Sequence, residues 1–173
     1  MAKRMDKLLF FGYGNLSRGD DPLGPLVIET LLEWQQERNW IHIRSLTDYQ
    51  LQIEHSMDLD NRDLVVFIDA GVNCCTPFGV SIYEPQINHS YTSHALNPSA
   101  LLEVYRQVNR INPPLSYTIS IRGQRFEMGQ ALSDSAKTNL AAAIMFIGKL
   151  CRSSLPGQAQ ALCDIAARTT RYA

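Results

Sequence analysis

An uninterrupted apolar run, Leu64-Val65-Val66-Phe67-Ile68, constrains the fold of this chain more than any other feature, and it ends at Asp69. A strand with one face in water alternates apolar and polar residues, whereas a strand that is covered on both faces is apolar throughout. The run therefore predicts a central strand of a sheet that carries helices on both sides.

Apolar periodicity predicts the remaining elements. Short apolar segments bounded by turn residues indicate strands, and apolar residues three or four positions apart indicate helices. The expected strands are 7–13, 41–46, 64–68, 80–84 and 116–121. Helices are expected at 22–37, at about 50–59, after the cap residues Asn97 and Ser133, and in a last segment that ends near 168. This alternation predicts an α/β fold with a parallel or mostly parallel sheet.

Length and charge narrow the class of protein. A chain of 173 residues suits one domain, and a net charge of −1 gives no general attraction for nucleic acid or for an acidic membrane. No apolar run approaches the roughly 20 residues of a membrane helix. The basic start, 1–7, leads into a short apolar stretch that ends at Gly12, unlike a signal peptide. We therefore expect a cytoplasmic protein without nucleic-acid or membrane partners.

The cysteines do not indicate a disulfide framework. There are four, Cys74, Cys75, Cys151 and Cys163, and none belongs to a C-x-x-C pair. In a cytosolic protein of this size they are expected to be reduced thiols. Cys74 and Cys75 follow Asp69 and could act as soft metal ligands or nucleophiles, but ordinary loop or core thiols are the favoured interpretation.

The glycine-rich segment 12–24 is the first candidate site. It starts like the dinucleotide fingerprint G-x-G-x-x-G, but Ser17 replaces the third glycine and the second strand is expected to end near Ser45-Leu46 without an acidic residue, which disfavours nucleotide binding. Asp20 and Asp21 stand just before Pro22. From the loop alone, helix capping is the favoured interpretation, since Asp is a good cap and Pro a good first helical residue. The alternative is a metal ligand or general base at the carboxyl end of the sheet, and one aspartate could cap while the other is free.

Asp69 and His94 complete the candidate site. A carboxylate at the end of a central strand is expensive to bury unless it is paired or bound to a metal, although a turn-forming Asp is an equal alternative. His94 stands in a predicted loop three residues before Asn97, where a surface role and metal ligation are both open. Two carboxylates and one imidazole at strand ends suit a hydrolytic metal site, which commonly has three protein ligands and one open position. These residues do not identify the substrate.

Several short segments in a fixed order carry a family resemblance. They are Gly12-Tyr13-Gly14-Asn15, Gly19-Asp20-Asp21-Pro22-Leu23-Gly24, Gln52-Ile53-Glu54, Val65-Val66-Phe67-Ile68-Asp69-Ala70, His94 with Pro98 and Leu101-Leu102, and Leu132-Ser133. The set resembles the hydrogenase maturation endopeptidases, a family of nickel-dependent processing proteases. Pro22 departs from the glycine that this family often has there, which changes the freedom of the loop.

The resemblance implies a fold and a site. The fold would be a three-layer α/β/α sandwich with a mostly parallel, twisted central sheet. One peptidase domain would span 1–173, with a family-like core at about 7–150 and a tail at 151–173. Asp21, Asp69 and His94 would be both the metal ligands and the catalytic residues.

The resemblance also implies an activity. The protein would remove the C-terminal extension from the nickel-loaded precursor of a [NiFe]-hydrogenase large subunit and would use the bound nickel for recognition. Nickel would arrive with this partner, and the protease would be a monomer without an organic cofactor. Two alternatives stay open, namely a general metal-dependent peptidase or amidase and a non-enzymatic precursor chaperone. No Ser/His/Asp set is convincing, because Ser93 and His94 are only adjacent in sequence.

Overall fold

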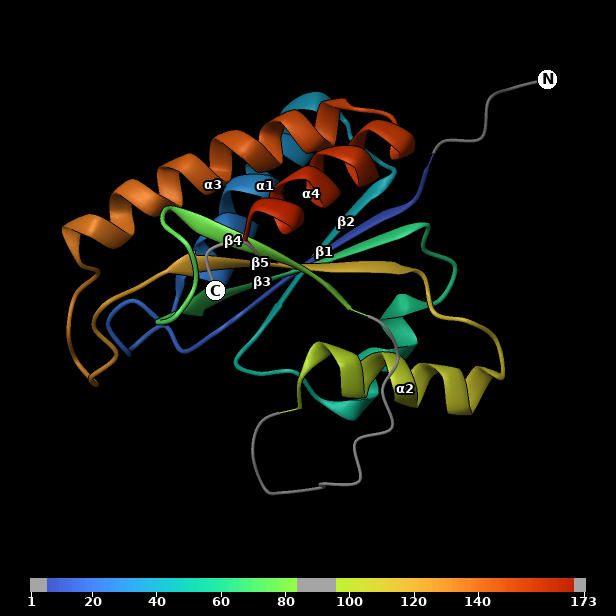
Figure 1. Ribbon diagram of the computed structural model, residues 1–173, viewed down its shortest axis with the longest axis horizontal. Coiled ribbons are helices and arrows are strands. Elements are labelled where there is room, and N and C mark those ends of the chain that lie inside the picture. The colour runs from blue at the N-terminus through green and yellow to red at the C-terminus, as the bar shows by residue number, and fades with distance from the viewer. Residues whose placement is uncertain (1–5, 84–95, 170–173) are drawn as a thin grey trace.

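A computed structural model of the chain describes residues 6–83 and 96–169. This part of the chain forms a five-stranded sheet in the order β2-β1-β3-β5-β4 (Figure 1). The strands are β1 (Leu8–Tyr13), β2 (Ile43–Asp48), β3 (Leu64–Gly71), β4 (Phe78–Tyr83) and β5 (Leu115–Arg122). Strands β2, β1, β3 and β5 are parallel, and β4 pairs antiparallel with β5. The prediction of a mostly parallel sheet is confirmed.

Helices cover both faces of the sheet and complete three layers (Figure 1). One face carries α1 (Leu23–Arg38), α3 (Asp134–Arg152) and α4 (Leu155–Thr169). The other face carries α2 (Pro98–Asn109) and a short 3-10 helix, η1 (Ile53–Leu59), which is the helix expected at about 50–59. Within the described residues, no helix is both long enough and apolar enough to cross a membrane.

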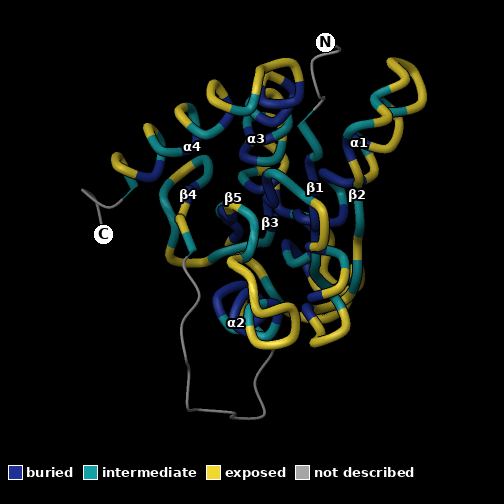
Figure 2. Tube along the Cα trace, turned by 90° about the vertical axis from the view of Figure 1, so that its right-hand side faces the viewer, coloured by how far each residue is buried: buried dark blue, intermediate teal, exposed yellow. Residues whose placement is uncertain are grey.

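The alternation of side chains along the strands divides the core in two. Leu8 and Phe10 of β1 pack with α1 and α3, whereas Leu9 and Phe11 pack with α2 and η1. The run 64–68 is covered on both faces, with every residue at most 1% exposed, as its continuous apolar character predicts. Figure 2 shows β3 at the centre of the molecule, with exposed residues on the outer turns of the helices. The tail is part of the same core, since Leu162 of α4 is fully buried.

Two of the three expected helix caps are present. The Asn97 side chain accepts a hydrogen bond from Ala100 N at 2.9 Å, and the Ser133 hydroxyl accepts one from Ala136 N at 3.2 Å. Helix α1 begins at Leu23 behind Pro22, and no side chain caps it. Capping of α1 by Asp20 or Asp21 is therefore wrong, because both carboxylates have other partners.

Close backbone packing places the β1–α1 loop over the ends of the central strands. A Cβ atom at Gly24 would collide with the carbonyl oxygen of Ile68 and would lie 2.8 Å from that of Tyr13. Glycine thus allows the first turn of α1 to rest directly on β1 and β3. As a consequence, the loop that carries Asp20 and Asp21 lies at the carboxyl edge of the sheet.

Candidate functional site

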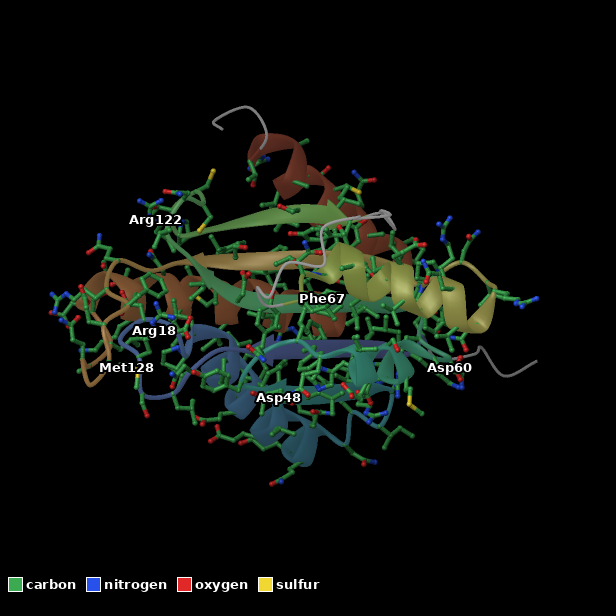
Figure 3. The ribbon with its side chains drawn as sticks, turned by 90° about the horizontal axis from the view of Figure 1, so that it is seen from below. Arg18, Asp48, Asp60, Phe67, Arg122 and Met128 are labelled. Atoms are coloured by element: carbon green, nitrogen blue, oxygen red, sulfur yellow. The ribbon has the colours of Figure 1, made fainter. Side chains whose placement is uncertain are left out.

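The predicted acidic residues lie at the carboxyl edge of the parallel strands, where ligands bind in open α/β sheets. Asp21 is in the loop after β1, and Asp69 is near the end of β3, the strand paired with β1. In Figure 3 the same edge shows Arg18 of the β1–α1 loop, Arg122 at the end of β5 and Met128 of the β5–α3 loop. Because β3 continues to Gly71, Asp69 lies within the strand and does not terminate it.

Asp69 has a strongly perturbed environment. Its Oδ2 accepts a hydrogen bond from the Tyr13 hydroxyl at 3.2 Å, whereas its Oδ1 is buried without a bond of ordinary geometry. Burial raises the pKa of Asp69 to about 6; the Ser120 and Tyr13 hydroxyls oppose this rise, and the Asp21 charge adds to it. A buried carboxylate oxygen without a donor is costly unless a cation or another donor meets it. Asp69 is therefore suited to bind a cation or to accept a proton.

Asp21 has a single hydrogen-bond donor in the described structure. Its Oδ2 accepts from the Asn15 backbone N–H at 2.8 Å. Its charge contributes to the raised pKa of Asp69, so the two carboxylates are within electrostatic reach of each other. The structure therefore brings together two of the three predicted site residues, one from the β1–α1 loop and one from β3.

Asp20 has a different role from its neighbour. It is 0% exposed, and its oxygens accept bonds from the backbone N–H groups of Gln124, Arg125 and Ser133 and from the Ser133 hydroxyl. Burial disfavours its charge, but these hydrogen bonds hold the pKa of Asp20 below its ordinary value. Asp20 is an ionised structural residue, and its oxygens are already engaged within the protein.

Tyr13 and Asn15 were not singled out by sequence reasoning. Burial and the neighbouring Asp69 raise the pKa of Tyr13, which keeps its hydroxyl protonated as a donor. The signal for Asn15 was its place in the glycine-rich segment, but the bond to Asp21 is made by its backbone. The contact between Tyr13 and Asp69 does not follow from residue spacing, since the two residues are 56 positions apart.

Cys74 lies close to the acidic pair but has the properties of an ordinary thiol. Its Sγ donates to the Gly71 carbonyl at 3.4 Å, and Arg122 donates to the Cys74 carbonyl at 3.0 Å. Burial and the charge of Asp69 raise the pKa of Cys74, with Arg122 acting in the opposite direction. Nucleophilic cysteines have lowered pKa values, so this environment favours a protonated, unreactive thiol.

His94 falls outside the described residues. Across 6–83 and 96–169, no group of three or more His, Cys, Asp or Glu side chains is arranged to hold a metal ion. The first described residue after the gap, Leu96, packs on the hydrophobic cluster that contains Phe67 and residues of α2. Asp69 lies on the same face of β3 as Phe67, because the two residues are two positions apart in the strand. The chain therefore resumes two residues after His94 on the same face of the sheet as Asp69.

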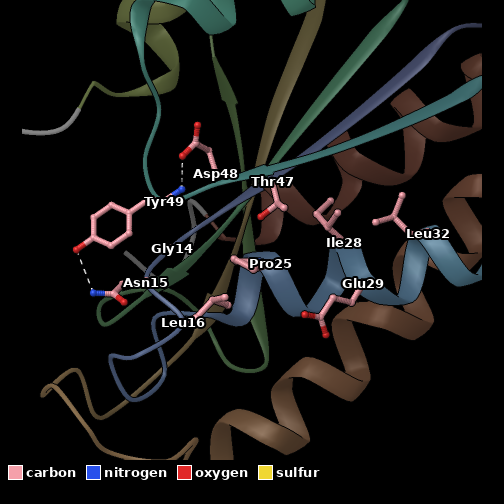
Figure 4. Close-up of a pocket in the computed structure, with 10 residues that line it drawn as sticks. All are labelled: Gly14, Asn15, Leu16, Pro25, Ile28, Glu29, Leu32, Thr47, Asp48 and Tyr49. Carbon is pink, nitrogen blue, oxygen red and sulfur yellow. Dashed lines mark hydrogen bonds between the residues drawn. The ribbon is translucent and has the colours of Figure 1, made fainter.

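A cavity of about 350 Å³ lies between the β1–α1 loop, α1 and the end of β2 (Figure 4). Its lining combines aliphatic walls with a few polar groups: Gly14, Asn15, Leu16, Pro25, Ile28, Glu29, Leu32, Thr47, Asp48 and Tyr49. Asn15 belongs both to this lining and to the site, because its backbone contacts Asp21 while its side chain donates to the Tyr49 hydroxyl at 3.0 Å. A largely apolar cavity that shares Asn15 with the site can receive a side chain of a bound peptide.

Fold and site together define a three-layer α/β protein with a pair of carboxylates at the carboxyl edge of its sheet. The fold is that of the [NiFe] hydrogenase maturation proteases. The chain is similar to the maturation protease HycI from Thermococcus kodakarensis KOD1, with a TM-score of 0.65 and 19% identity over 85% of this chain and 93% of that one. It is also similar to the hydrogenase maturating endopeptidase HybD from E. coli, with a TM-score of 0.64 and 17% identity over 82% and 89% of the two chains. No protein-family model matches the sequence, and no curated protein does.

Proposed function

We propose that this protein is an endopeptidase that removes the C-terminal extension of a nickel-loaded [NiFe]-hydrogenase large-subunit precursor. The observation that carries the proposal is the pair Asp21 and Asp69, of which Asp69 has a buried oxygen without a hydrogen bond of ordinary geometry. This pair lies at the carboxyl edge of a fold that is shared with hydrogenase maturation proteases. The protein is expected to act as a monomer in the cytoplasm.

In this proposal nickel belongs to the substrate, and the protease senses it. Asp21, Asp69 and His94 would supply two carboxylates and one imidazole, a ligand set of moderate strength for a divalent ion. Thiolates of the precursor would complete the coordination. Because the protease alone would bind nickel weakly, cleavage would depend on nickel that is already in the precursor.

The proposed reaction is hydrolysis of one peptide bond. Water adds to the carbonyl carbon, the C–N bond breaks, and the amine leaves with a proton. With a pKa of about 6, Asp69 is ionised at neutral pH and still basic enough to accept a proton from water. The Tyr13 hydroxyl would hold the Asp69 carboxylate in place while it binds the ion or accepts the proton.

The test is to mix the purified protein with nickel-loaded and nickel-free precursor and to measure the mass of the precursor. We expect shortening of the nickel-loaded form alone. Asp21→Asn, Asp69→Asn and His94→Ala should each abolish it, whereas His89→Ala, which alters another histidine of the same stretch, should process normally. Normal processing by all three site variants would refute the proposal.

Two other outcomes would support the alternatives. A protein that retains its own metal after purification and cleaves short peptides would be a general metal-dependent peptidase. A protein that binds the precursor without changing its mass would be a chaperone. Metal analysis of the isolated protein and a binding assay, performed with the same preparations, separate these cases from the proposed one.

A further inference from the structure

The buried carboxylate of Asp20 joins two loops that flank the candidate site. Four donors from the β5–α3 loop, 123–133, surround it: three backbone N–H groups at 2.7, 3.0 and 2.7 Å and the Ser133 hydroxyl at 2.8 Å. A carboxylate has about four positions at which it accepts hydrogen bonds, so these donors match its capacity. Asp20 is fully buried, and it therefore cannot contact substrate.

Further contacts join the same two loops around Asp20. The Asp20 N–H donates to the Arg125 carbonyl at 2.7 Å, the Gly129 N–H donates to the Ser17 carbonyl at 2.8 Å, and Arg18 Nε donates to the Phe126 carbonyl at 2.6 Å. Gly19 has a φ of +51° and packs so closely on the Arg125 carbonyl that a Cβ atom would collide with it. The β1–α1 loop is thus attached to the β5–α3 loop along 17–20.

Asp21 follows immediately after this attached segment. Its N–H donates to the Arg18 carbonyl at 2.9 Å, and its carboxylate accepts from Asn15 N at 2.8 Å. Asn15 in turn contacts the β5–α3 loop, because its side-chain nitrogen lies 3.7 Å from the Met128 sulfur. Both the backbone of Asp21 and the donor that orients its carboxylate therefore depend on how the two loops are joined.

We propose that Asp20 is a positioning residue, whose buried carboxylate fixes the β5–α3 loop to the β1–α1 loop and thereby holds Asp21 in the orientation that binds a divalent ion. The proposal rests on the proposed function for the role of Asp21, and on the contacts above for the role of Asp20. The two adjacent aspartates have separate tasks. Asp20 satisfies donors within the protein, and Asp21 remains open to the substrate's ion.

The direct test is Asp20→Asn. An amide cannot accept at both ends, so its NH₂ group faces a backbone N–H of Gln124, Arg125 or Ser133. Loss of a hydrogen bond to a charged group corresponds to about tenfold or more in an equilibrium constant. We expect the Asn15 amide to exchange its hydrogen about tenfold faster, and the protein to bind free Ni²⁺ about tenfold more weakly in a titration. In precursor processing, the variant should change kcat, which falls, more than it changes KM.

Two further variants distinguish positioning from a general loss of stability. Leu162→Ala removes a buried side chain from α4, which belongs to neither loop, and should destabilise the fold without changing Ni²⁺ affinity or exchange of the Asn15 amide. Ser133→Ala removes one of the four donors and should move both measurements in the same direction as Asp20→Asn, to a smaller extent. Ser133→Thr keeps the hydroxyl and should restore them.

The exchange measurement decides the inference by itself. If the Asn15 amide in Asp20→Asn is as protected as in the wild type, Asp20 does not position Asp21. Should Asp20→Asn not fold, the same criterion applies to Ser133→Ala. Should the wild-type protein fail to shorten the precursor, the proposed function is refuted, while faster exchange at Asn15 in the variant still supports the positioning role.

Discussion

The hydroxyl of Tyr13 donates a hydrogen bond to Oδ2 of Asp69 at 3.2 Å, which links the ends of two neighbouring strands. The second oxygen of Asp69 is buried and has no hydrogen bond of ordinary geometry. The site therefore contains an acid whose charge is poorly stabilised by the protein alone. Such an arrangement reduces the stability of the fold and is typical of functional sites.

Asp69 should make the protein less stable as the pH rises from about 4 to 6. Its pKa is about 6 in the folded protein against an ordinary value of 3.8, so the unfolded chain loses its proton first and unfolding becomes easier over this interval. The difference corresponds to about 3 kcal/mol. Asp69→Asn should therefore raise the free energy of unfolding at pH 7 relative to the wild type. Denaturant unfolding of both proteins between pH 4 and pH 7 measures this, and a variant that is less stable at pH 7 would contradict it.

Tyr13→Phe should raise the pKa of Asp69 further. The phenol favours the charged carboxylate, and phenylalanine keeps the ring while it removes the donor. The carboxyl signal of Asp69, followed by NMR during a pH titration, reports the change directly. Tyr49→Phe serves as the control, because its hydroxyl contacts Asn15 and not Asp69. An unchanged or lower pKa in Tyr13→Phe would show that the hydrogen bond has no such effect.

Gly24→Ala should destabilise the protein by about 3 kcal/mol or more, since the new methyl group would overlap the backbone of β3 and β1. Gly157→Ala is the matched control within α4. A Cβ atom there meets only ordinary contacts at 3.6 Å and 3.7 Å, and alanine is the better helix former by about 1 kcal/mol. Thermal unfolding of the two variants should give shifts of opposite sign. Equal stabilities would mean that α1 does not rest on the strands as described.

Cys74→Ser should process the precursor at a rate within about twofold of the wild type. The raised pKa of Cys74 keeps its thiol protonated at neutral pH, which disfavours a role as nucleophile or as thiolate ligand. Cys75→Ser provides the comparison at the adjacent position. A loss of processing that is confined to Cys74→Ser would restore the soft-ligand or nucleophile interpretation of this residue.

The elements of the fold were predictable because their signals are local. The apolar run 64–68, the cap residues Asn97 and Ser133, and the periodicity of the helices depend on neighbours within one turn or one strand. The two acidic residues of the site were also predictable as candidates, because parallel strands end at one edge of their sheet. His94 stays a prediction, since it lies outside the described residues.

The amino-acid sequence by itself determined which segments are strands and helices and which side chains could bind an ion. The residues alone left open which of the adjacent aspartates is free; the family resemblance assigned the ligand role to Asp21, and the tertiary structure shows that Asp20 is engaged by other donors. Sequence reasoning favoured a capping role in this loop, but the donors that engage Asp20 come from residues more than 100 positions away. Such contacts depend on how β1 and β5 are arranged in the sheet, and no local pattern encodes that arrangement.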